Sequence, residues 1–321
     1  MYASIVIPVR NGANHITSCL DALLKQKVKK PYEIIVVDDG SNDKTGEIVK
    51  KFKGVKLIKQ APSGPAKARN NGAEKAKGKI VLFIDSDCIA ESNWLEEMLR
   101  PFEDPKVAAV QGAYKTKQKS ILARFVQVEI EERYSRMLSS KEVDWIGTYS
   151  AAYRKEIFMR EGGFDERFKK ASGEDPELSY RIHKKGGKIV FNPNAIVYHT
   201  HPEKLSAYLK KKFQHAYWRI LLYKLHKDKA IKDSYTPQTL KAQIVFLGLA
   251  VLFGVFSLVE SGFLFLSIAS FLAMFASMLP FIIFALRRDF AVGIVSPIFL
   301  TLRDIVFVGG LALGTTKMLL K

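Results

Sequence analysis

The sequence predicts an α/β domain followed by transmembrane α-helices, and three observations lead to this fold class. Short β-rich runs alternate with segments of helical periodicity over residues 4–84. Charged residues, 26% of the 321, are dense up to about Lys241 and sparse after it. Long apolar segments then fill the C-terminal part. We therefore expect an α/β domain over residues 1–201, a basic amphipathic interfacial helix and linker over 202–240, and a transmembrane region of about three helices over 241–321.

The alternation near the N-terminus predicts a parallel sheet with helices on both faces. Apolar, β-branched runs indicate the strands, and amphipathic segments between them indicate the helices. The expected strands are residues 4–9, 33–37, 80–84, 105–114 and 188–198, and the expected helices are residues 13–26, 45–52, 66–76 and 121–138.

The composition restricts the classes of partner. The net charge of +18 favours anions, and the apolar C-terminal region makes a membrane surface and phosphorylated small molecules better candidates than nucleic acid. The two cysteines, Cys19 and Cys88, are too few for a disulfide framework, and we expect both to be reduced thiols in the core of a cytosolic domain. Residues 2–8 form an apolar run of strand length without a basic flank, so we expect no signal peptide.

Polar residues follow each of the first three expected strands. Arg10 ends the first, Asp38 and Asp39 end the second, and Asp85 and Asp87 flank Ser86 at the end of the third. The carboxyl ends of parallel strands meet at one edge of a sheet, where ligands collect, so these side chains should converge on one crevice. Carboxylate oxygens suit Mg²⁺ or Mn²⁺, which keep coordination sites open for phosphate oxygens.

Residues 64–72, GPAKARNNG, add a helix N-terminus and cations that favour a bound anion. Taken one by one, these features have simpler explanations, because aspartates at strand ends are common turn and cap residues. Taken together they describe a pocket for a phosphate and a metal ion. A dinucleotide-dependent oxidoreductase is the competing enzyme class, but the first strand is not followed by a GxGxxG motif.

The segment after His201 is basic and aromatic, as expected for a helix that lies in a membrane interface. An ordinary surface helix with a lysine-rich face is the alternative. The expected membrane spans are residues 242–259, 262–286 and 291–316.

Arg303 and Asp304 interrupt the third span, and we expect them to pair with neighbouring helices or lipid headgroups rather than simply with each other. If all three segments span, Lys241, Arg287 and Arg288 lie on the same side as the basic domain. The positive-inside rule then places the α/β domain in the cytoplasm of a multi-pass protein of the cell membrane.

Six segments, in this order, resemble the family 2 inverting glycosyltransferases with the GT-A fold: IVIPVRN, VVDDGSNDKT, GPAKARNNGA, IDSDC, GGFDERF and GEDPELSYRIHKKGGKI. The resemblance covers residues 3–201 and implies a Rossmann-like mixed sheet with flanking helices that binds a nucleotide-diphospho-sugar. It also implies metal-dependent hexosyl transfer with Mn²⁺ or Mg²⁺. It is specific for the family but not for the sugar or the nucleobase, and UDP-sugars are the favoured donors.

The resemblance assigns the donor-side roles residue by residue. Asp39 and the backbone around Pro8 would hold the nucleobase, with Arg10 against its face where the family often has tyrosine. Arg69 would approach the donor, and Asp85 the ribose or the metal. A further aspartate, Asp87, would ligate the metal that bridges the diphosphate.

On the acceptor side the resemblance makes Asp175 the general base, with Glu174 beside it. The chemistry agrees, because attack on the far face of the sugar needs a base across the crevice from the leaving group. The sequence Glu174-Asp175-Pro176 also has the form of a helix start, which would make Asp175 an N-cap. Both roles are compatible.

The resemblance also implies a metal-ligating histidine at about the position of His199, 24 residues after Asp175, and we assign the role to His199, with His201 as the alternative. His15, His183, His215 and His226 receive no such role. Trp218 is expected to line an acceptor site. It ends the segment QHAYW, where processive family members have QxxRW, and the tyrosine in place of arginine is a departure from that pattern.

The expected function is therefore transfer of a single sugar from a nucleotide-sugar donor at the cytoplasmic face of the membrane. The acceptor is expected to be lipid-linked, either a polyprenyl phosphate or a lipid-linked saccharide, because the basic collar and the membrane spans keep the crevice near headgroups. The alternatives are an enzyme related to processive polysaccharide synthases and a non-catalytic membrane protein that only binds nucleotide sugars.

Overall fold

The computed structural model describes residues 1–140, 142–170 and 172–319. The described residues form two compact units: residues 1–117 with 137–200, and residues 118–136 with 201–321 apart from the last two positions. The second unit includes residues 118–136, a segment that the expected boundaries placed in the α/β domain.

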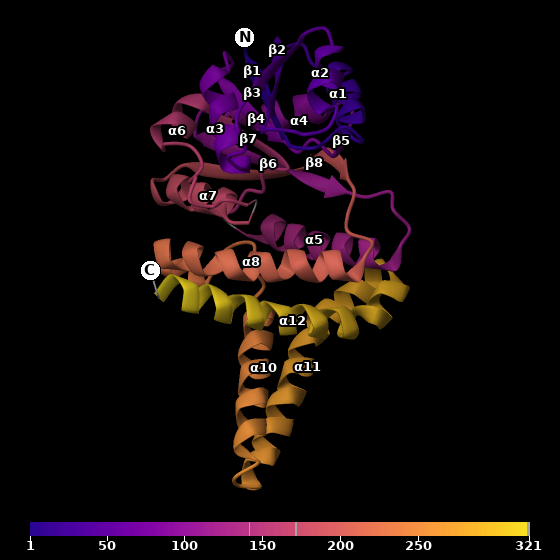
Figure 1. The fold of residues 1–321 in the computed structure, drawn as a ribbon, viewed down its shortest axis with the longest axis vertical. Helices are drawn as coiled ribbons and strands as arrows, with labels where there is room; N and C mark the ends of the chain where they lie inside the picture. Colours follow the sequence, from indigo (N-terminus) through magenta and orange to yellow (C-terminus); the bar gives the residue numbers. More distant parts are fainter. Residues whose placement is uncertain (141, 171, 320–321) are drawn as a thin grey trace. The chain divides into compact units, whose positions relative to one another are not determined.

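The first unit is built on one mixed sheet (Figure 1). Its eight strands lie in the order β3-β2-β1-β4-β7-β6-β8-β5. Strands β3, β2, β1 and β4 are parallel neighbours, whereas β7 is antiparallel to both β4 and β6, and β5 is antiparallel to β8. The strands are β1 (Ala3–Val9), β2 (Tyr32–Asp38), β3 (Val55–Lys59), β4 (Ile80–Ile84), β5 (Cys88–Ala90), β6 (Val107–Lys115), β7 (Ser150–Arg154) and β8 (Lys188–His199).

Helices of the first unit cover the sheet. Central strands such as β4, IVLFI, are buried along their whole length, which explains why their residues are apolar without alternation. Helix α3 approaches β1 closely at Gly72, where a Cβ would lie 2.3 Å from Val6 Cγ1, so only glycine fits there. The helices are α1 (Ile16–Leu24), α2 (Thr45–Lys50), α3 (Pro65–Lys75), α4 (Trp94–Leu99), the 3₁₀ helix η1 (Arg100–Glu103), α6 (Lys155–Arg160) and α7 (Glu174–Lys184).

The second unit is helical. Three of its helices are long and apolar enough to cross a membrane, by length and composition: α10, α11 and most of α12. An apolar core joins them to α5 and α8 through residues such as Phe125, Tyr208, Met278 and Leu300. The helices are α5 (Ile121–Ser139), α8 (Leu205–Leu225), α9 (Lys227–Ile231), α10 (Gln238–Phe256), α11 (Gly262–Arg288) and α12 (Phe290–Leu319).

All five expected strands and all four expected helices of the N-terminal part are present, with ends that differ by a few residues. The expectation of a parallel sheet is confirmed for β1 to β4 and is wrong for β5 and β7. Three strands, β3, β5 and β7, were not predicted. Cys19 and Cys88 are both free and buried, as expected.

Candidate active site

The sheet brings the polar strand ends of β1, β2 and β4 to one edge. The parallel register pairs Val9 with Asp38, and Val6 with Phe83, so the residues that follow each strand leave the sheet on the same side. Arg10, Asp39 and Asp85 therefore come to the same edge of the sheet, as the sequence predicts.

Arg69 connects this edge to the start of α7. Its Nη2 atom donates to Asp85 Oδ1 at 2.9 Å, and its Nη1 atom donates to Glu174 Oε1 at 2.8 Å. The side chains of Arg69 and Glu174 are only 3% and 1% exposed. An arginine in this setting stays charged and its planar fork fixes both partners. The strand end with the expected donor groups and the start of the helix that carries the expected base are thus joined through one buried cation.

The two acidic residues of α7 have different environments. Both carboxylate oxygens of Glu174 are engaged, one by Arg69 and the other by the backbone N–H groups of Ser172 and Gly173 at 2.9 and 3.1 Å. Asp175 is half-buried, and its Oδ2 accepts a long hydrogen bond of 3.4 Å from the backbone N–H of Thr148. The helix is capped by Gly173, so the expected N-cap role of Asp175 is wrong.

Burial, reinforced by the charge of Glu174, raises the pKa of Asp175 well above its usual value, although Arg69 opposes the shift. A carboxylate with a raised pKa is a stronger base than an ordinary one, which is the requirement for taking a proton from an acceptor hydroxyl near neutral pH.

Asp87 and His199 lie together, with 3.3 Å between Oδ2 and Nε2. The cause is the antiparallel pairing of β5 with β8, which sets Cys88 opposite His199. His201 lies in the second unit, where its Nε2 is 3.0 Å from Gln127 Oε1. Of the two histidines weighed for the metal, His199 is the one beside Asp87.

The carboxylate and imidazole groups at this edge are candidate ligands for a divalent cation. Among the described residues, no cluster of three or more His, Cys, Asp or Glu side chains is arranged to hold a metal ion, and Asp85 is paired with Arg69. The carboxylate of Asp87 and the imidazole of His199 nevertheless fit Mn²⁺ or Mg²⁺, because such ions take one or two protein ligands together with substrate phosphates and water.

Asp39 holds the loop that leads into α3. Its Oδ1 accepts from Gln60 Nε2 and from the backbone N–H of Ser63, both at 2.8 Å, and its Oδ2 accepts from the backbone N–H of Gly64 at 2.9 Å. The carboxylate therefore shapes the edge of the expected nucleobase site.

The remaining predicted site residues lie apart from these contacts. Arg10 is exposed and Pro8 is half-buried in β1. Trp218 is in α8 of the second unit, where its ring meets Tyr217 edge to face at 5.3 Å. Its role at an acceptor site stays a prediction.

Two residues near the site were not singled out from the sequence. His15 received no role from the sequence, but its Nε2 is 3.2 Å from the Oγ of Ser86. Ser86 is the residue between Asp85 and Asp87 in the sequence. Thr148 approaches Asp175 through its backbone, which no residue pattern reveals. For His15, the available signal was its position in the segment between β1 and α1, which follows the same strand end as Arg10.

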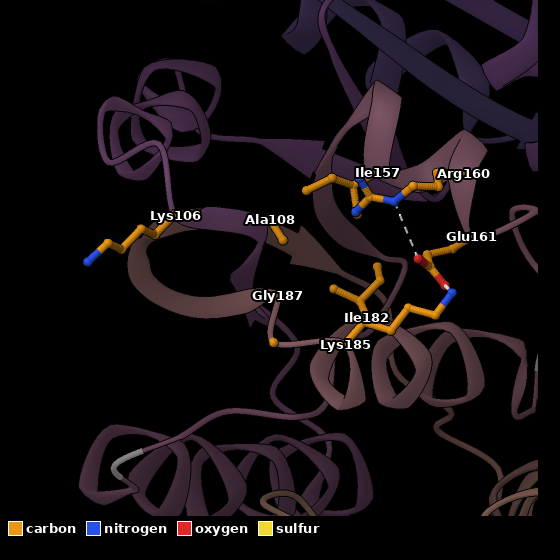
Figure 2. Close-up of a pocket in the computed structure, with 9 residues that line it drawn as sticks. Lys106, Ala108, Ile157, Arg160, Glu161, Ile182, Lys185 and Gly187 are labelled. Carbon is orange, nitrogen blue, oxygen red and sulfur yellow. Dashed lines mark ion pairs between the residues drawn. The ribbon is translucent and has the colours of Figure 1, made fainter.

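A cavity of about 200 Å³ lies elsewhere in the first unit (Figure 2). It is found where β6 and β8 begin, at the sheet edge opposite the carboxyl ends of β1 and β4. Glu161 lies between Arg160 and Lys185 and is paired with Lys185 at 2.9 Å (Figure 2). None of the predicted site residues lines it. The lining residues are Lys106, Ala108, Ile157, Arg160, Glu161, Ile182, Lys185, Gly186 and Gly187.

Comparison with known proteins identifies the family of the first unit. Residues 4–162 match the family described as "Glycosyl transferase family 2". A pre-mycofactocin glycosyltransferase from Mycobacterium tuberculosis is 29% identical over 218 residues, which cover 65% of this chain and 45% of that protein. The glycosyltransferase AglE from Haloferax volcanii is 38% identical over 117 residues, which cover 35% of this chain and 38% of that protein. The chain thus matches less than half the length of these two relatives.

A solved structure with a similar fold covers nearly the whole chain. It is the mannosyltransferase PcManGT from Pyrobaculum calidifontis in complex with GDP-Man and Mn²⁺, with a TM-score of 0.60, 19% sequence identity, and coverage of 99% of this chain and 86% of that chain. The expected fold class is confirmed by this likeness. The chain therefore contains a glycosyl transferase family 2 domain with a GT-A-like mixed sheet, followed by long apolar helices.

Proposed function

We propose that this chain transfers one sugar from a nucleotide-sugar donor to a membrane-held acceptor, with inversion at the anomeric carbon. The observation that carries the proposal is the buried bridge of Arg69 between Asp85 and Glu174, which joins the strand end of the donor site to the helix that bears Asp175. The family of the domain and the glycosyltransferase names of its relatives support the same activity.

Each of the site residues has a separate role in the proposed reaction. The acceptor oxygen attacks the anomeric carbon while its proton passes to the carboxylate of Asp175, and the bond from that carbon to the diphosphate breaks, with its electron pair leaving on the nucleoside diphosphate. Arg69 fixes the carboxylate of Glu174 by a hydrogen bond of 2.8 Å, and so holds the first turn of α7 in place for Asp175. Asp87 and His199 would hold Mn²⁺ or Mg²⁺, which supplies positive charge for the diphosphate.

The raised pKa of Asp175 helps to decide which chemical class of acceptor the site uses. A phosphate acceptor is already ionised and needs no base, whereas a sugar hydroxyl must lose its proton as it attacks. Of the two lipid-linked acceptors considered, a lipid-linked saccharide with a free hydroxyl is therefore favoured over a polyprenyl phosphate. The three apolar helices support a membrane location, and Lys241, Arg287 and Arg288 favour a cytoplasmic catalytic domain.

Donor and metal can be identified without knowing the acceptor. UDP-, GDP- and dTDP-sugars are tested with Mn²⁺ or Mg²⁺, and thermal stability and slow donor hydrolysis are measured in detergent. Both UDP and GDP donors are included because UDP-sugars are favoured by the family and PcManGT was solved with GDP-Man. We expect one donor at 100 times its Kd to stabilise the protein by about 2.7 kcal/mol, and a chelator to remove most of this effect.

Two aspartate variants sharpen the test. Asp87→Asn should lose the metal-dependent part of the stabilisation. Asp104→Asn, which alters a half-exposed carboxylate paired with Lys188 where β6 begins, should keep it. If no donor stabilises the wild-type protein with either metal, the proposed function is wrong.

A further inference from the structure

The third apolar helix of the second unit does not continue the hairpin formed by the first two. Helices α10 and α11 are antiparallel and paired along their length. Gln243 Nε2 donates to the backbone oxygen of Ser277 at 3.1 Å near one end, and Ser267 Oγ donates to that of Ala250 at 2.8 Å towards the other. Helix α12 instead turns away and runs across the base of the hairpin beside α8 (Figure 1).

The turn into α12 is sharp and is fixed to α5. Only Asp289 separates α11 from α12, and a Cβ on Gly293 would lie 2.8 Å from the Cα of Leu286. The carboxylate of Asp289 accepts from Arg124 Nε in α5 at 2.7 Å. The first turn of α12 is therefore held at the level where α11 ends in Arg287 and Arg288, two exposed cations suited to a membrane surface.

The middle of α12 lies at the same end of the hairpin. Arg303 Nη2 donates to Gln243 Oε1 at 2.6 Å, and Gln243 is in the second turn of α10. Were α12 to cross a bilayer, its middle would sit about 15 Å deep, half the thickness of the hydrocarbon core, while the second turn of α10 would lie near the surface. Side chains in hydrogen-bond contact cannot be so far apart in depth.

The charged groups around Arg303 also indicate that the middle of α12 lies near the membrane surface. Its Nη1 donates to Glu129 Oε1 at 3.1 Å, and Glu129 Oε2 accepts from Lys212 Nζ at 2.9 Å. Burial opposes ionisation of Glu129, but Lys212 and Arg303 outweigh it and lower its pKa to about 2. Asp304 bonds to Arg303 as well. Such an ionic cluster is costly in the centre of a bilayer and is tolerated near its boundary.

The last part of α12 lies along α8. A Cβ on Gly310 would be 2.5 Å from the backbone oxygen of Phe213, and one on Gly314 would be 2.7 Å from that of Tyr217. Both steps are four residues, so the two helices run parallel in a small-residue seam. Helix α8 exposes Lys210 and Lys211, which belong at a headgroup surface.

The outer face of α12 is an apolar stripe. Phe290, Ile294, Ile298, Ile305 and Leu313 are 70, 59, 62, 51 and 41% exposed, and their spacing places them on one side of the helix. The opposite side carries the buried Arg303 and the two seam glycines. One apolar side and one polar, protein-packed side are the pattern of a helix in the interface, with its apolar face in the acyl boundary.

We propose that α12 lies flat in the membrane interface with this stripe against lipid, so that only the α10–α11 hairpin crosses the bilayer. The sequence expectation of three spans is then reduced to two, and the end of α12 stays on the side of the catalytic domain. The inference rests on the membrane anchoring proposed above.

Three single-cysteine additions test the topology in the full-length protein, in sealed membrane vesicles of both orientations, with a membrane-impermeant maleimide. Lys50→Cys marks the catalytic domain, Ser261→Cys the tip of the hairpin, and Thr316→Cys the end of α12; all three positions are exposed. The parent protein gives the background, because both of its cysteines are buried.

We expect the variants at positions 50 and 316 to be labelled from one side of the membrane, and the variant at 261 from the other. Labelling of 316 together with 261 would show three spans and overturn the proposal, and labelling of 261 together with 50 would show that the hairpin does not cross. Donor hydrolysis is measured in the same vesicles, so that failure of the topology and failure of the proposed function are separate results.

Adjacent glycines provide a matched pair for the seam. Gly310→Ala should lower the melting temperature of the protein, although alanine is the better helix former, because its Cβ meets the backbone of α8. Gly309→Ala meets no atom closer than 3.5 Å and should be neutral or stabilising. Equal melting temperatures for the two variants would mean that α12 is not packed on α8, and the proposal would lose its basis.

Discussion

Replacing Asp175 with asparagine is expected to lower the rate of sugar transfer by about 10²–10⁴-fold while leaving donor affinity nearly unchanged. Asparagine has almost the same size and keeps a polar atom towards Thr148, but it cannot take the proton of an attacking hydroxyl. Transfer is measured as product formed per unit time, and donor affinity by thermal stabilisation of the same preparation. A protein that only bound nucleotide sugars would have no turnover to lose.

The control is Asp104→Asn, the same chemical change at the opposite edge of the sheet, which should keep full activity. Unchanged transfer in the Asp175 variant would mean either that another group is the base or that the acceptor is a phosphate that needs none. In that case the assignment of Asp175 is wrong, while a role in donor binding for the rest of the site survives.

The pH profile gives the same variant a second readout. Because the pKa of Asp175 is raised, its ionised, basic form is lost as the pH falls through a range above the usual carboxylate value of about 3.9. Wild-type transfer should therefore fall on the acid side within this range and recover as the pH rises. The residual activity of Asp175→Asn should lack that acid limb.

Replacing Arg69 with methionine is expected to destabilise the protein by about 3–5 kcal/mol. The substitution keeps much of the side-chain length but leaves Glu174, 1% exposed, as a buried carboxylate without its cation. This corresponds to a fall in melting temperature on the order of 10 °C, measured in detergent. Transfer should also fall, since Glu174 then no longer anchors the helix start that carries Asp175.

The control is Lys188→Met, which removes a lysine that is 55% exposed and paired with Asp104, 38% exposed. A surface pair of this kind contributes about 0–1 kcal/mol, so the melting temperature should hardly change. Adding Glu174→Gln to the Arg69 variant should recover part of the lost stability by removing the buried charge. Equal effects of Arg69→Met and Lys188→Met would contradict the buried bridge.

Periodicity predicted the parts of the fold whose signals are local. The buried strand β4 is a continuous apolar run followed by Asp85, and the helix α11 is a long apolar segment that ends in two arginines. The residues of such elements show by themselves whether the element is buried or could cross a membrane. The aspartates at the strand ends could also be placed at one edge, because the direction of parallel strands fixes where their ends meet.

Elements defined by their partners were not predictable. β5 is a strand only because Cys88 to Ala90 pair with β8, and β7 consists mostly of small residues whose pairing between β4 and β6 is a tertiary property. The bridge from Arg69 to Glu174 spans 105 positions, so nothing local in the sequence reports it. The apolar content of α12 predicted a span, and by length and composition the helix is a candidate for one. The turn at Asp289 and the contact with Gln243, on which the proposed interfacial position rests, depend on other helices and have no local signal.

The central claim is that an acceptor oxygen, deprotonated by a single base, displaces the nucleoside diphosphate from the far face of the sugar. The stereochemistry of the first product tests this claim most directly. The accepted donor is supplied with an α-linked sugar, water serves as the acceptor, and the released sugar is followed by proton NMR from the earliest minutes, before the anomers equilibrate. Inversion predicts that the β anomer appears first. If the α anomer appears first, the configuration is retained and the proposed roles of Asp175 and the donor edge are wrong.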